Sequence, residues 1–237
     1  MSRFLNRGIV FLWIILNPIV GASWAWHDQT HLAVAKAAGY KAWYNAAGAD
    51  MTKIKAGTIE EKNHYFDNDH NVNVTTQMVL DQANLYNHPN DEEGHLYGAI
   101  ISSLREFRNT KSVGKYAEYH MAFAAHYIGD LSQPLHNISY DNFNKDRHSI
   151  NDGIVEDEVL DKISKIQKNM YGIKLRPSHF DEDLAKEITR IANISRVLGL
   201  KLRAENRDMT QEEAYAQLGH SASLLKAVLK GISKSEK

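Results

Sequence analysis

Apolar residues recur at steps of three and four along most of the chain, while the strict alternation typical of strands is rare. Six stretches show this helical spacing: residues 31–47, 97–107, 116–128, 154–166, 184–202 and 212–232. Such spacing gathers apolar side chains on one face of a helix, where they can pack against other helices. Turn-forming residues interrupt it at 87–91, 137–147 and 171–179, where loops are expected. The pattern predicts an all-α fold, a single-domain helical bundle.

The first 25 residues differ in character from the rest of the chain. Two arginines precede an apolar run over residues 9–16, and small residues follow it. This order is typical of a secretory signal peptide, and the run is shorter than the roughly 20 residues that span a bilayer. We expect cleavage between Ala25 and Trp26, which leaves residues 26–237 as one domain of a secreted or periplasmic protein. An uncleaved membrane anchor is the alternative.

The segment from His126 to His136 carries side chains that are spaced for metal binding. His126 and Asp130 are four residues apart, so on a helix they lie on the same face and can converge on one ion or on two adjacent ions. Gly129 weakens the helix just before Asp130, and Pro134 disfavours helical backbone at the preceding residue. We therefore expect His136 to come from a bend or a new helical turn and to approach from another direction.

A second pair, His148 and Asp152, repeats the four-residue offset a short distance later. Either pair alone is more often an ordinary hydrogen-bonded pair than a set of metal ligands. Apolar residues surround the first pair, however, and burying a histidine and an aspartate costs several kcal/mol unless they are paired or bind a metal. The two pairs together indicate a metal site.

The order of these motifs resembles a known family. Trp26 and His31 come first, a central His-Tyr-Phe-Asp follows at residues 64–67, and the segments around Asp130 and Asp152 come last. This succession is similar to that of the zinc-dependent phospholipase C and single-strand nuclease superfamily, over nearly the whole chain after residue 25. The resemblance implies an all-helical fold with three zinc ions in a cleft.

The resemblance also implies a set of zinc ligands. One zinc would be bound by His64, His126 and Asp130, with Asp130 bridging to the second. The second would also take the free amino group and carbonyl oxygen of Trp26 and the imidazole of His31. The third would be bound by His136, His148 and Asp152. Imidazole nitrogen and carboxylate oxygen suit zinc, and an α-amino group can bind only when cleavage has freed it.

The family has one further acidic residue before the central histidine, which contacts zinc and can act as a base. Counting back from His64 leads to Asp50, whereas the local pattern, read as a shortened family segment, leads to Glu61 or Glu60. Glu61 and Glu60 precede His64 by three and four residues, so either can share a helix face with it. We rank Glu61 first, Asp50 second and Glu60 third. The catalytic residues would then be Asp130 and this acid.

Composition narrows the chemistry and the substrate. The 237 residues include no cysteine, which excludes disulfides and thiolate zinc sites. The 28 basic and 29 acidic residues are nearly balanced. The sequence has no stripe of basic residues interleaved with aromatic residues, the pattern that would indicate a groove for a polynucleotide. Within the superfamily that the chain resembles, these features favour the phospholipase C branch, and the resemblance then implies an enzyme that cleaves phospholipids at a membrane surface, by zinc-activated water, to diacylglycerol and a phosphorylated head group. A nuclease acting on single-stranded nucleic acid is the alternative, and a non-catalytic helical binding protein stabilised by metal is a third possibility. No obligate protein partner is evident.

Overall fold

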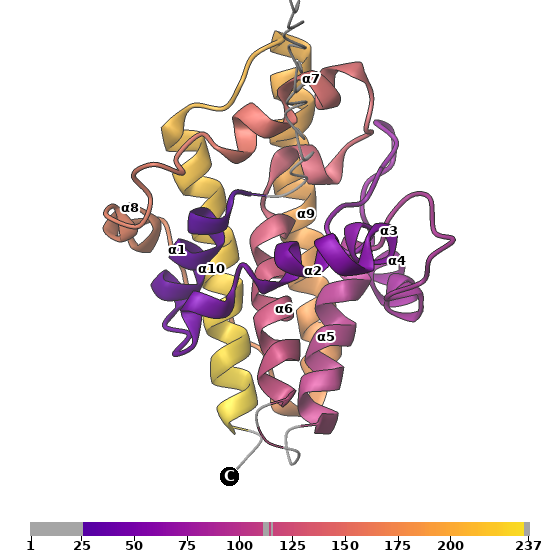
Figure 1. Ribbon diagram of the computed structural model, residues 1–237, viewed down its shortest axis with the longest axis vertical. Helices are drawn as coiled ribbons and strands as arrows, with labels where there is room; N and C mark the ends of the chain where they lie inside the picture. The colour runs from indigo at the N-terminus through magenta and orange to yellow at the C-terminus, as the bar shows by residue number, and fades with distance from the viewer. Residues whose placement is uncertain (1–25, 111–113, 115, 235–237) are drawn as a thin grey trace, which may run out of the picture.

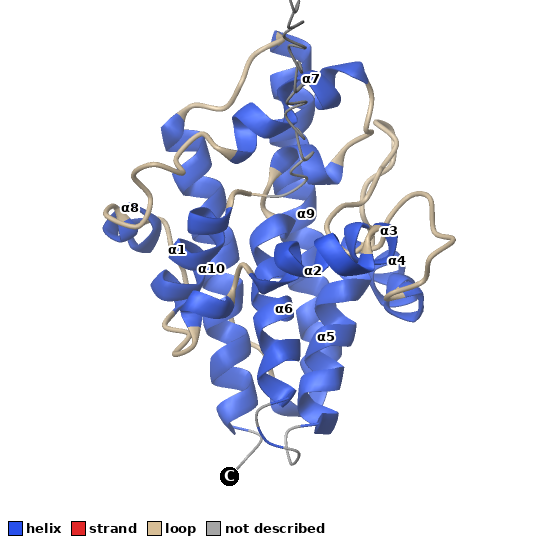
Figure 2. Cartoon of the chain, viewed as in Figure 1, coloured by secondary structure: helices blue, strands red, loops and turns tan. Residues whose placement is uncertain are grey.

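The computed structural model describes residues 26–110, 114 and 116–234, and within these ranges the chain forms helices and loops without any strand (Figure 2). The α-helices are α1 (Asp28–Ala38), α2 (Gly48–Ala56), α3 (Thr58–Glu61), α4 (Thr76–Gln82), α5 (Leu96–Thr110), α6 (Ala117–Leu131), α7 (Asn142–Asp152), α8 (Ile163–Lys168), α9 (Phe180–Glu205) and α10 (Gln211–Lys234). Short 3-10 helices are η1 (Trp43–Asn45), η2 (Ala83–Leu85), η4 (Pro134–Asn137) and η5 (Pro177–His179). The all-α prediction is confirmed. The expected signal peptide, residues 1–25, lies outside the described residues.

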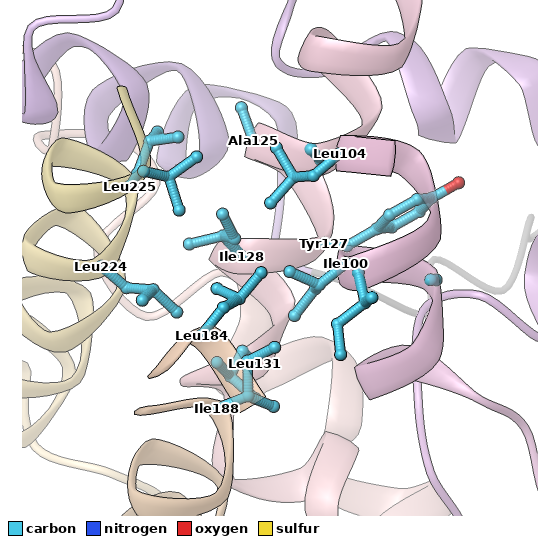
Figure 3. Close-up of a cluster of buried hydrophobic side chains, with 14 of the residues drawn as sticks. Ile100, Leu104, Ala125, Tyr127, Ile128, Leu131, Leu184, Ile188, Leu224 and Leu225 are labelled. Carbon is cyan, nitrogen blue, oxygen red and sulfur yellow. The ribbon is translucent and has the colours of Figure 1, made fainter. Parts of the chain in front are cut away.

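Four long helices, α5, α6, α9 and α10, form the centre of the molecule, and the shorter helices pack around them (Figure 1). Their facing side chains make one large apolar core. Figure 3 shows part of it, with Ile100 and Leu104 from α5, Ile128 and Leu131 from α6, Leu184 and Ile188 from α9, and Leu224 and Leu225 from α10. All of these side chains are buried. Each contributes on the order of 1.5–3 kcal/mol to the free energy of unfolding, so the core fixes α6 firmly.

A second apolar cluster attaches α1 to the other side of the bundle. Trp26 is fully buried there together with Val34 of α1, Leu202 of α9 and Tyr215 of α10. The start of the described chain is therefore held inside the protein. Among the described residues, no helix combines the length and the apolar character that a membrane crossing requires.

The helical spacing predicted the long helices correctly and the short ones poorly. Residues 97–107, 184–202 and 212–232 lie within α5, α9 and α10, and the stretch 116–128 begins one residue before α6. The helix expected over 31–47 ends at Ala38 because Gly39 adopts a left-handed conformation (φ 83°) and its N–H bonds to the last helical carbonyls. The helix expected over 154–166 is wrong for most of its length, since turns precede α8.

The loop expected over 137–147 is also wrong in its second half. Helix α7 begins at Asn142, because the side chain of Asp141 accepts a hydrogen bond from the backbone N–H of Asn144 and caps the helix. The short helices α2, α3 and α4 carry too few turns to show a clear apolar period, and the sequence did not predict them. Two of them, α2 and α3, carry acidic residues of the site.

Candidate metal centre

Histidines and aspartates from distant segments converge in the interior as three adjoining groups, each of which could hold a metal ion. The Asp130 group consists of His31, His126 and Asp130; the Asp50 group of Asp50, His64 and His126; the Asp152 group of His136, His148 and Asp152. Within each group the potential ligand atoms lie within 4.8 Å of one another. The groups draw on α1, α2, α6, η4 and α7, and on the segment after α3.

Asp130 lies at the centre and its two carboxylate oxygens face different neighbours. Oδ1 lies 3.4 Å from Nε2 of His31 and 3.6 Å from Nδ1 of His136. Oδ2 lies 2.9 Å from Nδ1 of His64 and 3.4 Å from Nε2 of His126. Asp130 is therefore placed to bridge the first two groups, and it also approaches the third.

The Asp152 group depends on the turn that follows α6. Pro134 opens η4 as expected, and this new turn carries His136 to α7, where its Nε2 lies 3.1 Å from Nε2 of His148. The two imidazole rings stack with an interplanar angle of 16°. Asp152, one turn after His148 on α7, places Oδ2 3.4 Å from the same Nε2 of His148. The side chain of Gln133 donates a hydrogen bond to the other oxygen of Asp152.

Two of the imidazoles are oriented by acceptors on the side that faces away from the groups. Nδ1 of His126 lies 2.8 Å from the backbone oxygen of Ala46, and Nδ1 of His148 lies 2.6 Å from Oδ1 of Asn144. A neutral imidazole carries one N–H, so donation to these acceptors leaves the inner Nε2 unprotonated, with its lone pair directed at the metal group. This is the form in which histidine binds metals.

Several buried atoms of these groups lack a hydrogen-bond partner in the described part of the chain. They are both ring nitrogens of His31, Oδ1 of Asp130, Nδ1 of His136 and Oδ2 of Asp152. An unsatisfied buried polar atom costs roughly 1–3 kcal/mol, so a concentration of them at one place needs an explanation. Metal ions would satisfy these nitrogen and oxygen atoms together, and the residues present therefore fit a metal centre.

Burial sets the charges of these side chains. It lowers the pKa values of His31 and His126 to about 4, and those of His64 and His136 well below the usual range, so all four are neutral at pH 7. Burial also raises the pKa of Asp130 well above its usual value. The centre therefore offers neutral imidazoles to a metal, while a metal has to compete with a proton at the carboxyl group.

The pKa of Asp152 is likewise raised by burial, against the opposing hydrogen bond from Gln133. Asp50 behaves differently. Burial alone would raise its pKa, but His126 and Lys53 outweigh that effect and the pKa is lowered. Asp50 is thus the carboxylate that stays ionised most readily, and its side chain is 18% exposed whereas that of Asp130 is fully buried.

Of the three acids considered from the sequence, Asp50 is the one that the structure brings into a metal group. Its Oδ2 lies 3.6 Å from Nε2 of His126, and its Oδ1 lies 3.8 Å from Nδ1 of His64. Glu61, ranked first, belongs to none of the groups found among the described residues. Glu60 contacts His64 on the opposite ring nitrogen. The geometry thus favours Asp50, whose position depends on the packing of α2, an element that the spacing did not predict.

Trp26 and Gly129 also meet the centre, in different ways. The backbone N–H of Trp26 donates a hydrogen bond to Asp130, so the nitrogen expected to become the amino terminus already lies at the cluster. Helix α6 continues through Gly129 to Leu131. The role of Gly129 is steric, since a Cβ at this position would lie 2.5 Å from Nδ1 of His31.

Lys53, Gln133 and Asn144 are functional candidates that the sequence reasoning missed. Nζ of Lys53 lies 2.6 Å from Oδ1 of Asp50, one helical turn before it on α2. That three-residue offset would have identified the pair had α2 been expected. Asn144 precedes His148 by four residues on α7, an offset that would have indicated their contact had α7 been expected. Gln133 reaches Asp152 from the turn after α6, and no spacing rule indicates that contact.

No family model matches the chain, and neither curated proteins nor solved structures give a significant match. The fold and the site themselves define an all-helical protein with three adjoining, buried His/Asp groups that could bind metal ions.

Proposed function

We propose that this protein is a secreted, zinc-dependent phosphodiester hydrolase of the phospholipase C type. The observation that carries the proposal is the convergence of three candidate metal groups on Asp130. A single structural zinc takes four ligands in a closed shell, so three adjoining groups favour a catalytic centre over a stabilising ion. Zinc suits the imidazole and carboxylate ligands, and when bound it supplies water activation and neutralises charge on phosphate oxygens.

The residues around Asp50 would receive the substrate. Asp50 is the most exposed member of the three groups, so the phosphate would approach from the side of α2. As an ionised carboxylate within reach of His64 and His126, Asp50 can orient the attacking water and accept its proton. The ammonium group of Lys53 beside it would attract the phosphate oxygens. Asp130, which contacts a histidine of each metal group, would fix the positions of the three groups relative to one another.

The surface next to Asp50 supports a lipid substrate. Met51 follows Asp50 on α2 and is 68% exposed, and Tyr44 and Tyr119 are also largely exposed. Together with Phe123 these side chains line a cavity of about 520 Å³. Aromatic and apolar side chains of this kind suit the interface between lipid head groups and acyl chains. A phospholipid could therefore place its acyl region there while its phosphate reaches Asp50 and Lys53.

One observation favours the alternative, a single-strand nuclease of the same superfamily. Tyr140 lies near Glu61 and Tyr65, and a lysine ammonium covers each tyrosine ring, Lys62 at 5.6 Å from the ring centroid of Tyr65 and Lys145 at 5.2 Å from that of Tyr140. Half-exposed tyrosines beside lysines can stack on bases and contact phosphates. Glu61 beside them would repel a polynucleotide, and for this reason we place the nuclease second.

Processing of the amino terminus belongs to the same proposal. Cleavage between Ala25 and Trp26 would turn the backbone N–H that bonds to Asp130 into a free amino group at the same place. An unprotonated α-amino group is a metal ligand, so secretion would complete the centre. A non-catalytic, metal-stabilised protein would need no such coupling and would bind about one zinc rather than about three.

The proposal is tested by offering the zinc-loaded secreted protein phosphatidylcholine vesicles and, separately, single-stranded DNA. Diacylglycerol and phosphocholine are expected from the vesicles, while release of nucleotides from DNA would support the nuclease instead. Asp130→Asn should abolish either activity and lower the zinc content, whereas Asp157→Asn, an exposed acid outside the groups, should leave both unchanged. Full activity and full zinc content in Asp130→Asn would refute the proposed centre.

A further inference from the structure

Glu60 is a buried carboxylate that the proposed chemistry does not use. Its side chain is only about 5% exposed, at the end of the short helix α3, and Oε1 lies 3.3 Å from Nε2 of His64. The other ring nitrogen of His64, Nδ1, faces Asp130 and Asp50. Glu60 therefore lies behind the imidazole as seen from the metal groups, where it cannot bind the same ion as Nδ1.

The contact repeats what is seen at two other histidines. His126 and His148 each direct one nitrogen at a metal group and the other at an acceptor, a backbone oxygen and an amide oxygen respectively. At His64 the acceptor is a carboxylate. An acceptor behind an imidazole holds the proton on the outer nitrogen and fixes the angle of the ring, which directs the inner lone pair at the metal.

Glu60 is itself fixed by two donors. The hydroxyl of Tyr127 donates to Oε1 at 2.6 Å, and Nδ2 of Asn63 donates to Oε2 at 3.2 Å. Tyr127 belongs to α6, directly after His126, and Figure 3 shows its hydroxyl oxygen pointing away from the apolar core. The hydrogen bond therefore ties α3 to the same turn of α6 that carries a metal-facing histidine.

Asn63 extends this anchoring toward the surface. Its Oδ1 lies 2.9 Å from Nε2 of His95, and Nδ1 of His95 lies 2.7 Å from Oδ2 of Asp91. A second contact joins Nδ2 of Asn63 to Oδ1 of Asn87 at 2.9 Å. Glu60 is thus the inner end of a hydrogen-bonded network with little freedom to move, which suits a side chain that has to hold another one in place.

We propose that Glu60 is the positioning residue for His64: it accepts the N–H of Nε2, with Tyr127 and Asn63 as its supports, and so presents Nδ1 to the Asp50 group. This inference rests on the proposed metal centre but not on the substrate. It also assigns Glu60 a role other than the ligand or base considered from the sequence.

The test compares zinc binding to Glu60→Leu, Glu60→Gln and Tyr127→Phe with binding to the unsubstituted protein, by titration of zinc against a chelator of known affinity. Removing the acceptor in Glu60→Leu is expected to weaken one of the bound ions about 10–100-fold and to leave the ion of the Asp152 group unchanged. Glu60→Gln keeps an oxygen acceptor and should restore most of the affinity. Tyr127→Phe should weaken the same ion by a smaller factor. The visible spectrum of the cobalt-substituted protein should change with the affinity.

A matched control is the hydrogen bond from Tyr215 to Glu158, which is 2.8 Å long and joins two residues outside the groups. Tyr215→Phe should leave every zinc affinity unchanged. Wild-type affinity and an unchanged cobalt spectrum in folded Glu60→Leu would overturn the proposal, as would equal weakening of all ions. If Glu60→Leu does not fold, Tyr127→Phe decides by the same criterion. If the substitutions change zinc binding as expected but the unsubstituted protein is inactive on both substrates, the proposed function is refuted and the positioning role of Glu60 stands.

Discussion

The imidazole of His31 rests directly on the backbone of Gly129, so closely that a Cβ at residue 129 would lie 2.5 Å from Nδ1. Gly129→Ala therefore forces the ring or the helix to move. We expect the free energy of unfolding to fall by about 1–3 kcal/mol, the usual cost of overpacking, and the ion of the Asp130 group to bind more weakly. Urea denaturation of the metal-free protein and a zinc titration measure the two effects separately.

Gly172→Ala is the matched control for this change. A Cβ there would meet nothing within 4 Å, and the residue lies exposed in a loop outside the metal groups. It should alter neither the stability nor the zinc affinity. Gly129→Ala with the stability and zinc affinity of the unsubstituted protein would show that the close contact has no consequence.

The second prediction separates the two acids that the sequence ranked highest. Asp50→Asn removes a carboxylate that lies within 4 Å of His64 and His126, so the Asp50 group should lose its ion or bind it much more weakly, and hydrolysis should stop. Glu61→Gln alters an acid outside the groups and should keep the full zinc content. Zinc analysis of both purified variants gives the answer. The reverse outcome would restore Glu61 as the ligand.

Spacing predicted those parts of the centre that lie on one helix. His126 with Asp130, and His148 with Asp152, are each separated by one helical turn, and a single helix then fixes their relative positions. The position of Asp50 depends instead on how α2 packs against α6, and the meeting of His31 with Gly129 depends on how α1 does. Such contacts between distant segments leave no local period in the sequence, which is why Asp50 was ranked second and the contact of Gly129 with His31 was not expected.

The same distinction applies to the fold. The long helices of the core carry a full apolar stripe that the sequence displays, as in α10, where Leu224, Leu225 and Val228 are all buried. Helix α7 has mostly polar residues, and it forms because Asp141 caps it and because His148 and Asp152 are held at the centre. Neither the cap nor the buried His148 and Asp152 forms an apolar stripe, so a search for apolar periodicity does not find this helix.

The third prediction concerns pH. Burial raises the pKa values of Asp130 and Asp152, so in the metal-free protein these carboxyl groups keep protons at pH values where an exposed aspartate has lost its own. Zinc has to displace those protons, and its affinity should therefore increase as the pH rises from about 4 toward the raised pKa values. His31 and His126, with pKa values of about 4, contribute few protons above pH 5.

Calorimetric titrations in buffers of different ionisation enthalpy measure this proton release directly. At pH values where these carboxyl groups carry protons, zinc binding should release those protons into the buffer, and Asp152→Asn should release fewer than the unsubstituted protein. Binding that releases no protons, with an affinity independent of pH, would contradict the assignment of the carboxyl groups as protonated in the metal-free state.

The last prediction concerns stability with and without metal. The unpartnered nitrogen and oxygen atoms of the centre destabilise the metal-free protein, and zinc binds to them only when the fold has brought them together. Binding to the folded state alone raises the free energy of unfolding by about 2.7 kcal/mol for each site when free zinc is 100 times the dissociation constant. Urea denaturation should show this gain on adding zinc and its loss on adding a chelator. Asp130→Asn should retain only the part of this gain that is due to the Asp152 group, because Asp130 contacts the histidines of the Asp130 group and of the Asp50 group. An equal gain in both proteins would mean that zinc binds elsewhere.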